Sequence, residues 1–263
     1  MLTLCATLGY AAYVYIPPIL RGTGCEARTK LGELSLTTEQ AQNAATVAAV
    51  GIRMDLPRRA TTIALAAAFQ ESKLRNVAYG DRDSLGLFQQ RPSQGWGKPR
   101  QILDPVYAAT QFYAALRDVQ GYRTMPVHQA AQAVQRSADG TAYARHTTEA
   151  KILSAALTGR AGAALRCWFD EDSEEFDFQG LRTQLVREFG QGVELQASDG
   201  GMNIVVPGQR RGWALALWAV AKAEENGIAS VAYSGSRWTA GNGYEGWQPA
   251  DTPARRVLIR GQT

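Results

Sequence analysis

The sequence predicts a mixed α+β fold in which a larger all-α domain precedes a smaller α+β domain. Apolar residues recur at helical spacing through much of residues 33–160, whereas short β-branched runs alternate with helical stretches over residues 181–263. An acidic run within residues 161–180 separates these two regions. The 263-residue chain is 45% hydrophobic and 20% charged, a composition that is typical of globular proteins and excludes wholesale disorder.

The N-terminal segment, residues 1–24, is predicted to be a transmembrane anchor or a signal segment. No charged side chain occurs before Arg21, and an apolar stretch of about 20 residues is long enough to cross a bilayer as a helix. No Lys or Arg precedes this stretch, which weakens the signal-peptide alternative. With either interpretation we expect the protein outside the cytoplasm, anchored in the membrane or secreted to the cell wall.

The three cysteines are too few for a disulfide-rich scaffold. In an oxidising compartment we expect a disulfide between Cys25 and Cys167, with lipidation of Cys25 as the alternative. Two histidines make a histidine-based zinc site unfavourable, and we expect neither a metal nor a cofactor. The net charge of +4 favours an anionic partner, but export and the lack of a recognised binding motif argue against nucleic acid.

Five helices are predicted in the first domain. Thr37 or Thr38 can cap the first of them, and the pair Asp104-Pro105 provides an N-cap and a first helical residue for the third. Glycine and proline interrupt the helical pattern over residues 76–100, which predicts a loop with short strands at most. The predicted helices cover residues 37–53, 57–72, 104–119, 126–137 and 141–157.

The acidic linker is predicted to cover residues 161–180. The small α+β domain is predicted to follow it, over residues 181–263. Its helices are expected at residues 181–189 and 211–226, and its strands at 201–207, 229–234 and 256–260. A GxGxxG run over residues 241–246 is not followed by a helix, so it predicts a turn and no nucleotide site. Trp238 and Trp247 flank this turn, where they could form a ligand-facing pair.

Glu71 is the candidate general acid. It lies near the end of a predicted helix whose middle is apolar on every face, next to a polar, glycine-rich segment. A carboxylate at the edge of an apolar core loses solvation, which favours the protonated form that glycosidic bond cleavage requires. The alternative is a surface ion pair between Glu71 and Lys73, Arg75 or Arg82.

The pair Glu71-Ser72, followed by the segment Gly86–Pro92 (GLFQQRP), resembles the ES…GLMQ…P signature of the lysozyme-like lytic transglycosylases. The Asp104-Pro105 helix start looks like the family's third motif, and residues 131–137 stand in the place of its fourth, so the resemblance covers roughly residues 38–157. The run over residues 79–97 (YGDRDSLGLFQQRPSQGWG) is also similar to a group of exported actinobacterial proteins that carry an extra C-terminal domain.

This resemblance implies a lysozyme-like fold for the first domain and cleavage of the β-1,4 linkages of peptidoglycan, with Glu71 as general acid and later as base. It also implies that the segment around the first two motifs, together with the fourth, contacts the glycan. The residues expected to bind substrate on this basis are Ser72, Gly86, Leu87, Phe88, Gln89, Gln90 and Gln135. Trp96, like Phe88, could stack on a sugar or cover the core.

Two departures leave alternatives open. The family places Tyr-Asn where this chain has Val134-Gln135, so a tyrosine near the acid has to come from Tyr79, Tyr107 or Tyr143. A hydrolase would also need a second carboxylate, for which Asp81 and Asp83 are the candidates. Aspartates in such a loop also commonly bond to nearby backbone N–H groups. A catalytically inactive protein that binds or organises the cell wall is therefore the alternative function.

Overall fold

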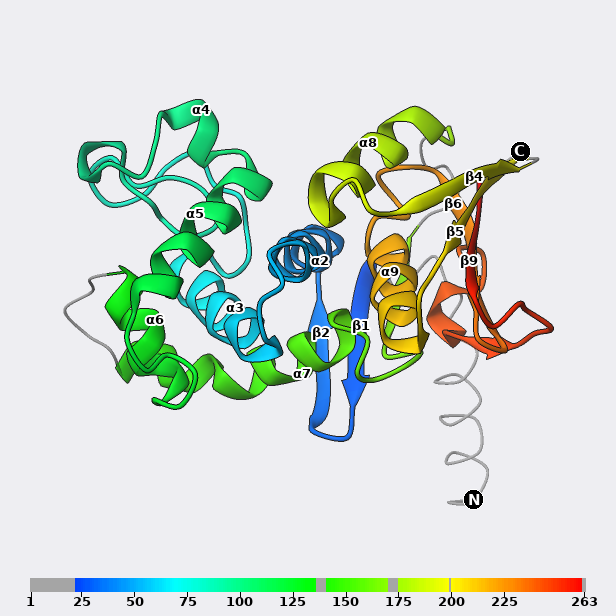
Figure 1. Ribbon diagram of the computed structural model, residues 1–263, viewed down its shortest axis with the longest axis horizontal. Coiled ribbons are helices and arrows are strands. Elements are labelled where there is room, and N and C mark those ends of the chain that lie inside the picture. The colour runs from blue at the N-terminus through cyan, green and yellow to red at the C-terminus, as the bar shows by residue number, and fades with distance from the viewer. Residues whose placement is uncertain (1–21, 136–140, 170–174, 199, 262–263) are drawn as a thin grey trace, which may run out of the picture.

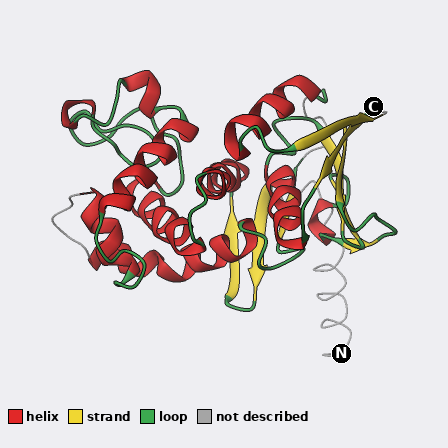
Figure 2. Cartoon of the chain, in the orientation of Figure 1, coloured by secondary structure: helices red, strands yellow, loops and turns green. Residues whose placement is uncertain are grey.

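The computed structural model describes residues 22–135, 141–169, 175–198 and 200–261 (Figure 1). Helices and strands both contribute to the fold, and the strands gather toward the C-terminal side of the molecule (Figure 2). The predicted α+β class is confirmed. Most of the predicted anchor or signal segment lies outside the described residues. Within the described part of the chain, no helix is both long and apolar enough to cross a membrane.

The helices of the first region lie close to where the sequence predicts them. Thr37 caps α2 through a reciprocal pair of hydrogen bonds with Gln40, and Asp104 caps α5 by accepting a hydrogen bond from the Val106 N–H. The predicted fifth helix is divided into a 3₁₀ segment, η3, and α7. The bounds are α2 Thr38–Arg53, α3 Arg58–Ser72, η2 Pro92–Gln94, α4 Pro99–Ile102, α5 Pro105–Asp118, α6 Val127–Gln135, η3 Thr141–His146 and α7 Thr147–Leu157.

The helix α3 is the centre of this region. Every residue from Ala60 to Phe69 is buried, as expected for a helix that is apolar on all faces. It packs against α2, α5, α6 and α7. The last turn of α3 leaves the core, and Glu71 therefore lies where buried helix gives way to irregular chain.

The first region is not all-α, which corrects the sequence prediction. Residues before α2 form the hairpin of β1 (Gly24–Thr29) and β2 (Gly32–Leu36). A third strand, β3 (Leu165–Trp168), pairs antiparallel with β1 and lies inside the predicted acidic linker. The sheet order is β2-β1-β3, and β1 packs against α7. Burial of Cys25, Ala27, Leu165 and Cys167 accounts for these short strands, since their inner face joins the core.

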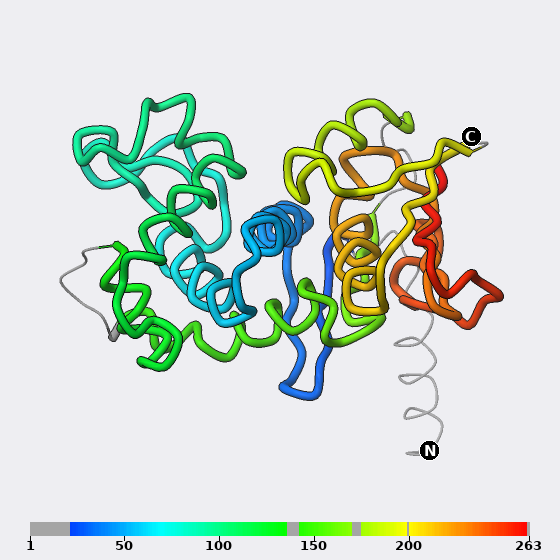
Figure 3. The backbone as a smooth tube through the Cα atoms, in the orientation of Figure 1, coloured from blue at the N-terminus to red at the C-terminus, as the bar shows by residue number. Residues whose placement is uncertain are grey.

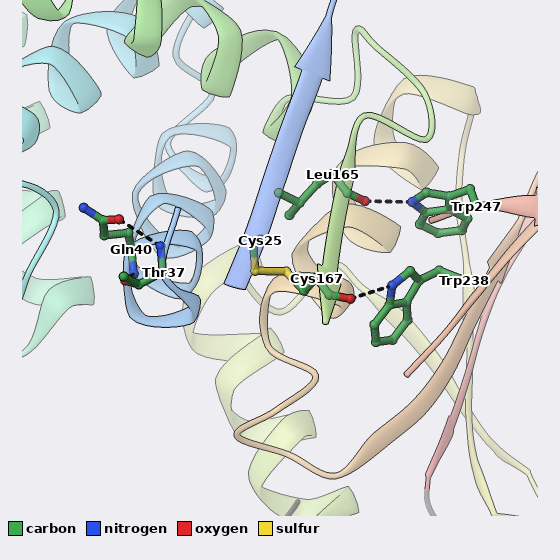
Figure 4. The surroundings of a disulfide bond; sticks show 7 residues. All are labelled: Cys25, Thr37, Gln40, Leu165, Cys167, Trp238 and Trp247. Carbon is green, nitrogen blue, oxygen red and sulfur yellow. Dashed lines mark hydrogen bonds between the residues drawn. A yellow bond between two sulfur atoms is a disulfide. The ribbon is translucent and has the colours of Figure 1, made fainter. Parts of the chain in front are cut away.

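The predicted disulfide between Cys25 and Cys167 is present and joins directly opposed residues of β1 and β3 (Figure 4). On the other edge of β3, the Trp238 indole donates a hydrogen bond to the Cys167 carbonyl at 3.1 Å and the Trp247 indole donates one to the Leu165 carbonyl at 2.8 Å. The two tryptophans thus take the place of a neighbouring strand, and Trp238 is fully buried. They do not form the ligand-facing pair considered from the sequence.

The glycine-rich turn after Trp238 packs against the same strand. A Cβ atom on Gly243 would lie 2.1 Å from the Cys167 carbonyl oxygen, so only glycine fits there. The spacing of glycines in this turn therefore reflects a close approach of two backbones.

The C-terminal region is a six-stranded antiparallel sheet with two helices. Its strand order is β4-β5-β9-β6-β7-β8, and α9 packs against β6 and β9 (Figures 1 and 3). Three strands, β4, β7 and β8, were not expected from the sequence. The bounds are α8 Phe178–Phe189, β4 Glu194–Ser198, β5 Gly201–Val205, α9 Gln209–Ala221, β6 Ile228–Tyr233, β7 Ser236–Thr239, η4 Gly243–Glu245, β8 Gln248–Pro249 and β9 Arg256–Gly261.

A buried polar cluster joins the two regions where α2 meets α8 and α9. The Glu188 carboxylate, 3% exposed, accepts hydrogen bonds from the Thr46 hydroxyl at 3.0 Å and the Trp218 indole at 2.7 Å. Lys222 lies 3.4 Å from the same carboxylate. These contacts provide a cation and two donors for the Glu188 carboxylate, as a buried charge requires.

We expect the double substitution of Cys25 and Cys167 by Ser to lower the free energy of unfolding. The cysteines are 142 residues apart. Loss of a crosslink that closes so long a loop costs about 4–5 kcal/mol in the chain-entropy description. Urea denaturation of the full chain measures the change, and reduction of the parent protein should reproduce it. Rapid alkylation of both thiols in the unreduced, folded parent would contradict the crosslink.

We expect Glu188→Ala to destabilise the protein by about 3 kcal/mol, because it leaves the buried Lys222 ammonium with only the more distant Glu225 carboxylate, 3.9 Å away. Thr46→Val, which removes one donor from the cluster, should cost about 1 kcal/mol. Urea denaturation gives both values, and the double variant Glu188→Leu/Lys222→Met should lose much less than the sum of its single substitutions. Additive losses would show that the two groups are not coupled.

Candidate functional site

The Glu71 carboxyl group meets the hydroxyl of Tyr143 at the end of α3. The Tyr143 hydroxyl donates a hydrogen bond to Glu71 Oε1 at 2.5 Å, a distance typical of a hydroxyl bonded to a carboxylate. Tyr143 lies in η3 and is 1% exposed, whereas Glu71 is half-buried. Among the described residues Glu71 forms no ion pair, so the expected alternative partners, Lys73, Arg75 and Arg82, do not hold it.

Two further contacts attach η3 to the same turn of α3. The Arg145 guanidinium donates hydrogen bonds to the Gln70 side-chain oxygen at 3.0 and 3.3 Å. The His146 ring stacks on Phe69, with 5.6 Å between ring centroids. Burial lowers the pKa of His146, which favours its neutral form in this stack. Three consecutive residues of α3 are thus each contacted by η3, and this fixes Tyr143 over Glu71.

The chain turns sharply after Ser72, and α2 holds this turn. Lys73 and Leu74 both adopt left-handed backbone conformations, with φ of 55° and 60°. The Gln40 side-chain amide donates to the Lys73 carbonyl at 2.9 Å, and that of Asn43 donates to the Leu74 carbonyl at 2.8 Å. Two hydrogen bonds from a buried helix therefore stabilise two unfavourable backbone conformations beside the candidate acid.

The segment Gly86–Gln90 lies against the end of α3, as the resemblance implies. The Ser72 hydroxyl donates to the Leu87 carbonyl at 2.8 Å. Gly86 has a φ of 73°, and a Cβ atom there would lie 2.7 Å from the Ile102 carbonyl oxygen, so the position requires glycine. Ser72 and Gly86, both expected to bind substrate, are thus structural links that bring the segment to Glu71.

The three glutamines of the candidate site form hydrogen bonds with backbone carbonyls. Gln89, with a φ of 46°, donates to the Tyr79 carbonyl at 3.2 Å. Gln90 is buried and donates to the Ala108 carbonyl at 3.2 Å. Gln135 on α6 donates to the Phe88 carbonyl at 2.6 Å. These side chains connect the segment to its neighbours, a role that the sequence did not indicate.

The side chains of Leu87 and Phe88 lie in the core, which corrects the expectation that they bind substrate and confirms the alternative that Phe88 covers the core. Both are fully buried, and Phe88 stacks on Phe112 with 4.6 Å between ring centroids. Apolar side chains of this size gain more by joining the core than by facing water. Of this segment, the backbone and the partly exposed Gln89 side chain are left to contact a ligand.

The two candidate second carboxylates differ in their surroundings. Asp83 accepts hydrogen bonds from Arg91 Nε and the Ser93 N–H, both at 2.8 Å, and these contacts hold its pKa well below the ordinary range. The Asp83 carboxylate therefore connects the two ends of the loop between residues 83 and 93. Asp81 is almost completely exposed, with the Arg82 side chain 3.9 Å away. Neither arrangement resembles that of a buried catalytic nucleophile.

The three tyrosines considered as replacements for the missing family tyrosine differ in whether they contact Glu71. Tyr79 is 77% exposed, and the Tyr107 hydroxyl donates to the Trp96 carbonyl at 3.2 Å. Only Tyr143 bonds to Glu71 among these three. The supporting residues Gln70, Arg145 and His146 are not indicated by the sequence, because their roles depend on contacts between α3 and η3 that no local pattern encodes.

A metal site is not indicated at this position. In the ranges that the structure describes, no group of three or more His, Cys, Asp or Glu side chains is placed to hold an ion. What the site offers chemically is a carboxyl group, a phenol bonded to it, and nearby backbone groups of a fixed segment.

We expect Asp83→Asn to lower the melting temperature at pH 7 and to have a smaller effect near pH 2, where only part of the contribution of the carboxylate remains. A carboxyl whose pKa is lowered by folding contributes stability above its unfolded pKa of about 3.9, and this contribution is lost as the pH falls toward the folded value. Thermal melts of both proteins between pH 2 and 7 measure the difference. The control is Asp81→Asn, which alters an exposed side chain and should melt like the parent throughout. If the melting temperatures of the parent and Asp83→Asn differed by the same amount across this range, the lowered pKa assigned to Asp83 would be wrong.

The chain matches no protein-family model and no curated protein. Its function has to be inferred from the geometry around Glu71 together with the motifs that the sequence carries.

Proposed function

We propose that the protein is a peptidoglycan-cleaving enzyme of the lytic transglycosylase type, with a lysozyme-like first domain and Glu71 as its general acid and base. The observation that carries the proposal is the 2.5 Å hydrogen bond between Glu71 Oε1 and the Tyr143 hydroxyl at the end of a buried helix. A single half-buried carboxyl group with a phenol fixed on one oxygen suits proton transfer through the other.

In the proposed reaction Glu71 protonates the glycosidic oxygen, and the C1–O bond breaks with its electron pair passing to that oxygen. The resulting carboxylate then removes a proton from the sugar's own 6-hydroxyl group, which attacks C1 and closes an anhydro ring. This route needs no second carboxylate. The loop contacts of Asp83 and the exposure of Asp81 favour it over hydrolysis, in which an aspartate would act as nucleophile or activate water.

The proposal places the protein outside the cytoplasm, with the membrane as a partner if residues 1–24 anchor it. Support comes from the Cys25–Cys167 disulfide, because such crosslinks persist in oxidising compartments. The second candidate function is an inactive wall-binding or scaffold protein. The observation that favours it is that Val134 is buried and Gln135 bonds to the Phe88 carbonyl, so the fourth motif supplies no tyrosine to the site.

We expect Glu71→Gln to reduce the release of fragments from purified peptidoglycan by about 10²–10⁴-fold, the usual contribution of a general acid and base. Tyr143→Phe should reduce the rate by a smaller factor, since it removes the bond that orients the carboxyl group. The matched control is Tyr79→Phe, which removes an exposed hydroxyl and should act like the parent. Mass spectrometry of the fragments released by the full chain measures all four proteins.

The products distinguish the possible outcomes. Anhydro-muropeptides from the parent but not from Glu71→Gln would support the transglycosylase. New reducing ends would indicate hydrolysis and would require a second carboxylate. If the parent released no fragments yet sedimented with the wall, the enzyme proposal would be wrong and the wall-binding function would replace it.

A further inference from the structure

The six-stranded C-terminal sheet has one face that packs on α9 and an opposite face that does not. Figure 1 shows α9 between this sheet and the first region, and α9 packs against β6 and β9 as well as against α2 and α7. A Cβ atom on Gly212 of α9 would lie 2.1 Å from Tyr233 Cζ, so Tyr233 of β6 points toward the helix. Successive side chains of a strand point to opposite faces, and the pairing of the strands therefore identifies the residues of the other face.

This other face, here called the open face, presents one row of opposed residues that crosses all six strands. The row has amides at both ends and two apolar residues at its centre, of which one is half-buried and the other buried. It consists of Gln196, Asn203, Leu258, Ala232, Arg237 and Gln248. The positions two residues away along β9 on either side of this row are Arg256 and Arg260.

Three arginines of the open face have no carboxylate partner. Arg237 and Arg256 are exposed, and the half-buried Arg260 is held on the face by a hydrogen bond of 3.2 Å from its Nη1 to Asn203 Oδ1. None of the three forms an ion pair with a described residue. Elsewhere in the described chain, carboxylates pair with Arg28, Arg82, Arg91, Arg166 and Arg187. The positive charge of the open face is thus left for a ligand to neutralise.

The spacing of these arginines suits a ligand with several anionic groups. Arg256 and Arg260 are four residues apart in β9, which corresponds to about 14 Å along the strand, and Arg237 lies two strands away, about 10 Å across the sheet. Separate anionic groups of one chain reach such positions better than a single small ion does. At the described strand positions of this face the one carboxylate is Glu194, which lies on the edge strand β4, two strands from Arg256.

The remaining side chains of the open face distinguish between classes of polyanion. Single-stranded nucleic acid is bound through aromatic side chains on which bases stack, and membrane surfaces are bound through large apolar side chains that enter the lipid. None of the described strand positions on this face is aromatic, and its central Leu258 is half-buried. The face offers amides and hydroxyls instead, such as those of Gln196, Ser230 and Thr239, which suit a ligand rich in hydroxyl groups.

We propose that the open face binds a linear polymer of phosphodiester-linked polyols. Arg237, Arg256 and Arg260 bind its phosphate groups, because the planar guanidinium matches two phosphate oxygens at once. The amides and hydroxyls between the arginines bind the polyol hydroxyls. This site lies on the C-terminal sheet and does not involve Glu71, so it does not rest on the proposed function.

The test uses the full chain and a purified, end-labelled glycerol phosphate polymer, with fluorescence anisotropy as the measurement. Arg237→Ala and Arg256→Ala should each weaken binding about fivefold, the loss expected for one exposed ion pair. The two losses should combine in the double variant. Each substitution should also reduce the dependence of log affinity on log salt by about one.

Three further variants serve as controls. Glu194→Gln removes the carboxylate of the face and should strengthen binding severalfold, an effect that loss of folding cannot produce. Arg182→Ala removes an exposed arginine of α8 and should bind like the parent. Glu71→Gln should also bind like the parent, so that failure of the enzyme proposal and failure of this one are seen separately.

The outcomes that would overturn the proposal are specific. If the parent did not bind the polymer at low salt, or if the double arginine variant bound it like the parent, the open face would not be the site. A single-stranded oligodeoxynucleotide, polyglutamate and phosphatidylglycerol vesicles are the competing probes. If one of these bound more tightly than the polymer and lost that affinity in the double variant, the polyol phosphate would be the wrong ligand.

Discussion

The strand β3 is the constraint on which the arrangement of the two regions depends. In an antiparallel pair, alternate residues direct their backbone groups to the partner strand and away from it. The Cys25–Cys167 disulfide fixes the register of β3 on β1, so the Leu165 and Cys167 carbonyls must point outward. Those carbonyls receive the indole N–H groups of Trp238 and Trp247. A shift of β3 by one residue would remove both bonds, and the position of the C-terminal sheet is therefore tied to the crosslink.

The helix α2 connects this arrangement to the candidate site. Its residues Gln40, Asn43 and Thr46 are spaced three apart, and residues at this spacing lie next to one another on a helix surface. Gln40 and Asn43 hold the turn that follows α3, while Thr46 bonds to Glu188 of α8. These three polar side chains of an alanine-rich helix donate hydrogen bonds to two backbone carbonyls on one side and to a buried carboxylate on the other. The conformation of the turn beside Glu71 is thus supported by a helix that the C-terminal region also holds in place.

The sequence predicts helices better than strands here, and the reason lies in the range of the interactions. Caps such as Thr37 and Asp104 act within their own turn, so a local pattern reveals them. Strand β3 has four residues and finds its partner 142 residues away at the disulfide, and no local pattern encodes that pairing. The segment around Phe88 lies next to Ser72, but periodicity could not show that Phe88 turns inward to stack on Phe112. The sequence indicated a segment that lies beside the end of α3, and packing decided which of its atoms face out.

The phenol beside Glu71 comes from outside the segment that resembles the family's fourth motif. In this chain the fourth motif has Val134, which enters the core, and Gln135, which holds the Phe88 carbonyl. The phenol comes from η3 instead, because contacts of η3 with Phe69 and Gln70 place Tyr143 over Glu71. A carboxyl group responds to the groups within hydrogen-bonding distance and not to their order in the chain. The departure at Val134 therefore leaves the proposed acid with a phenol, and the case for an active enzyme depends on η3 staying docked on α3.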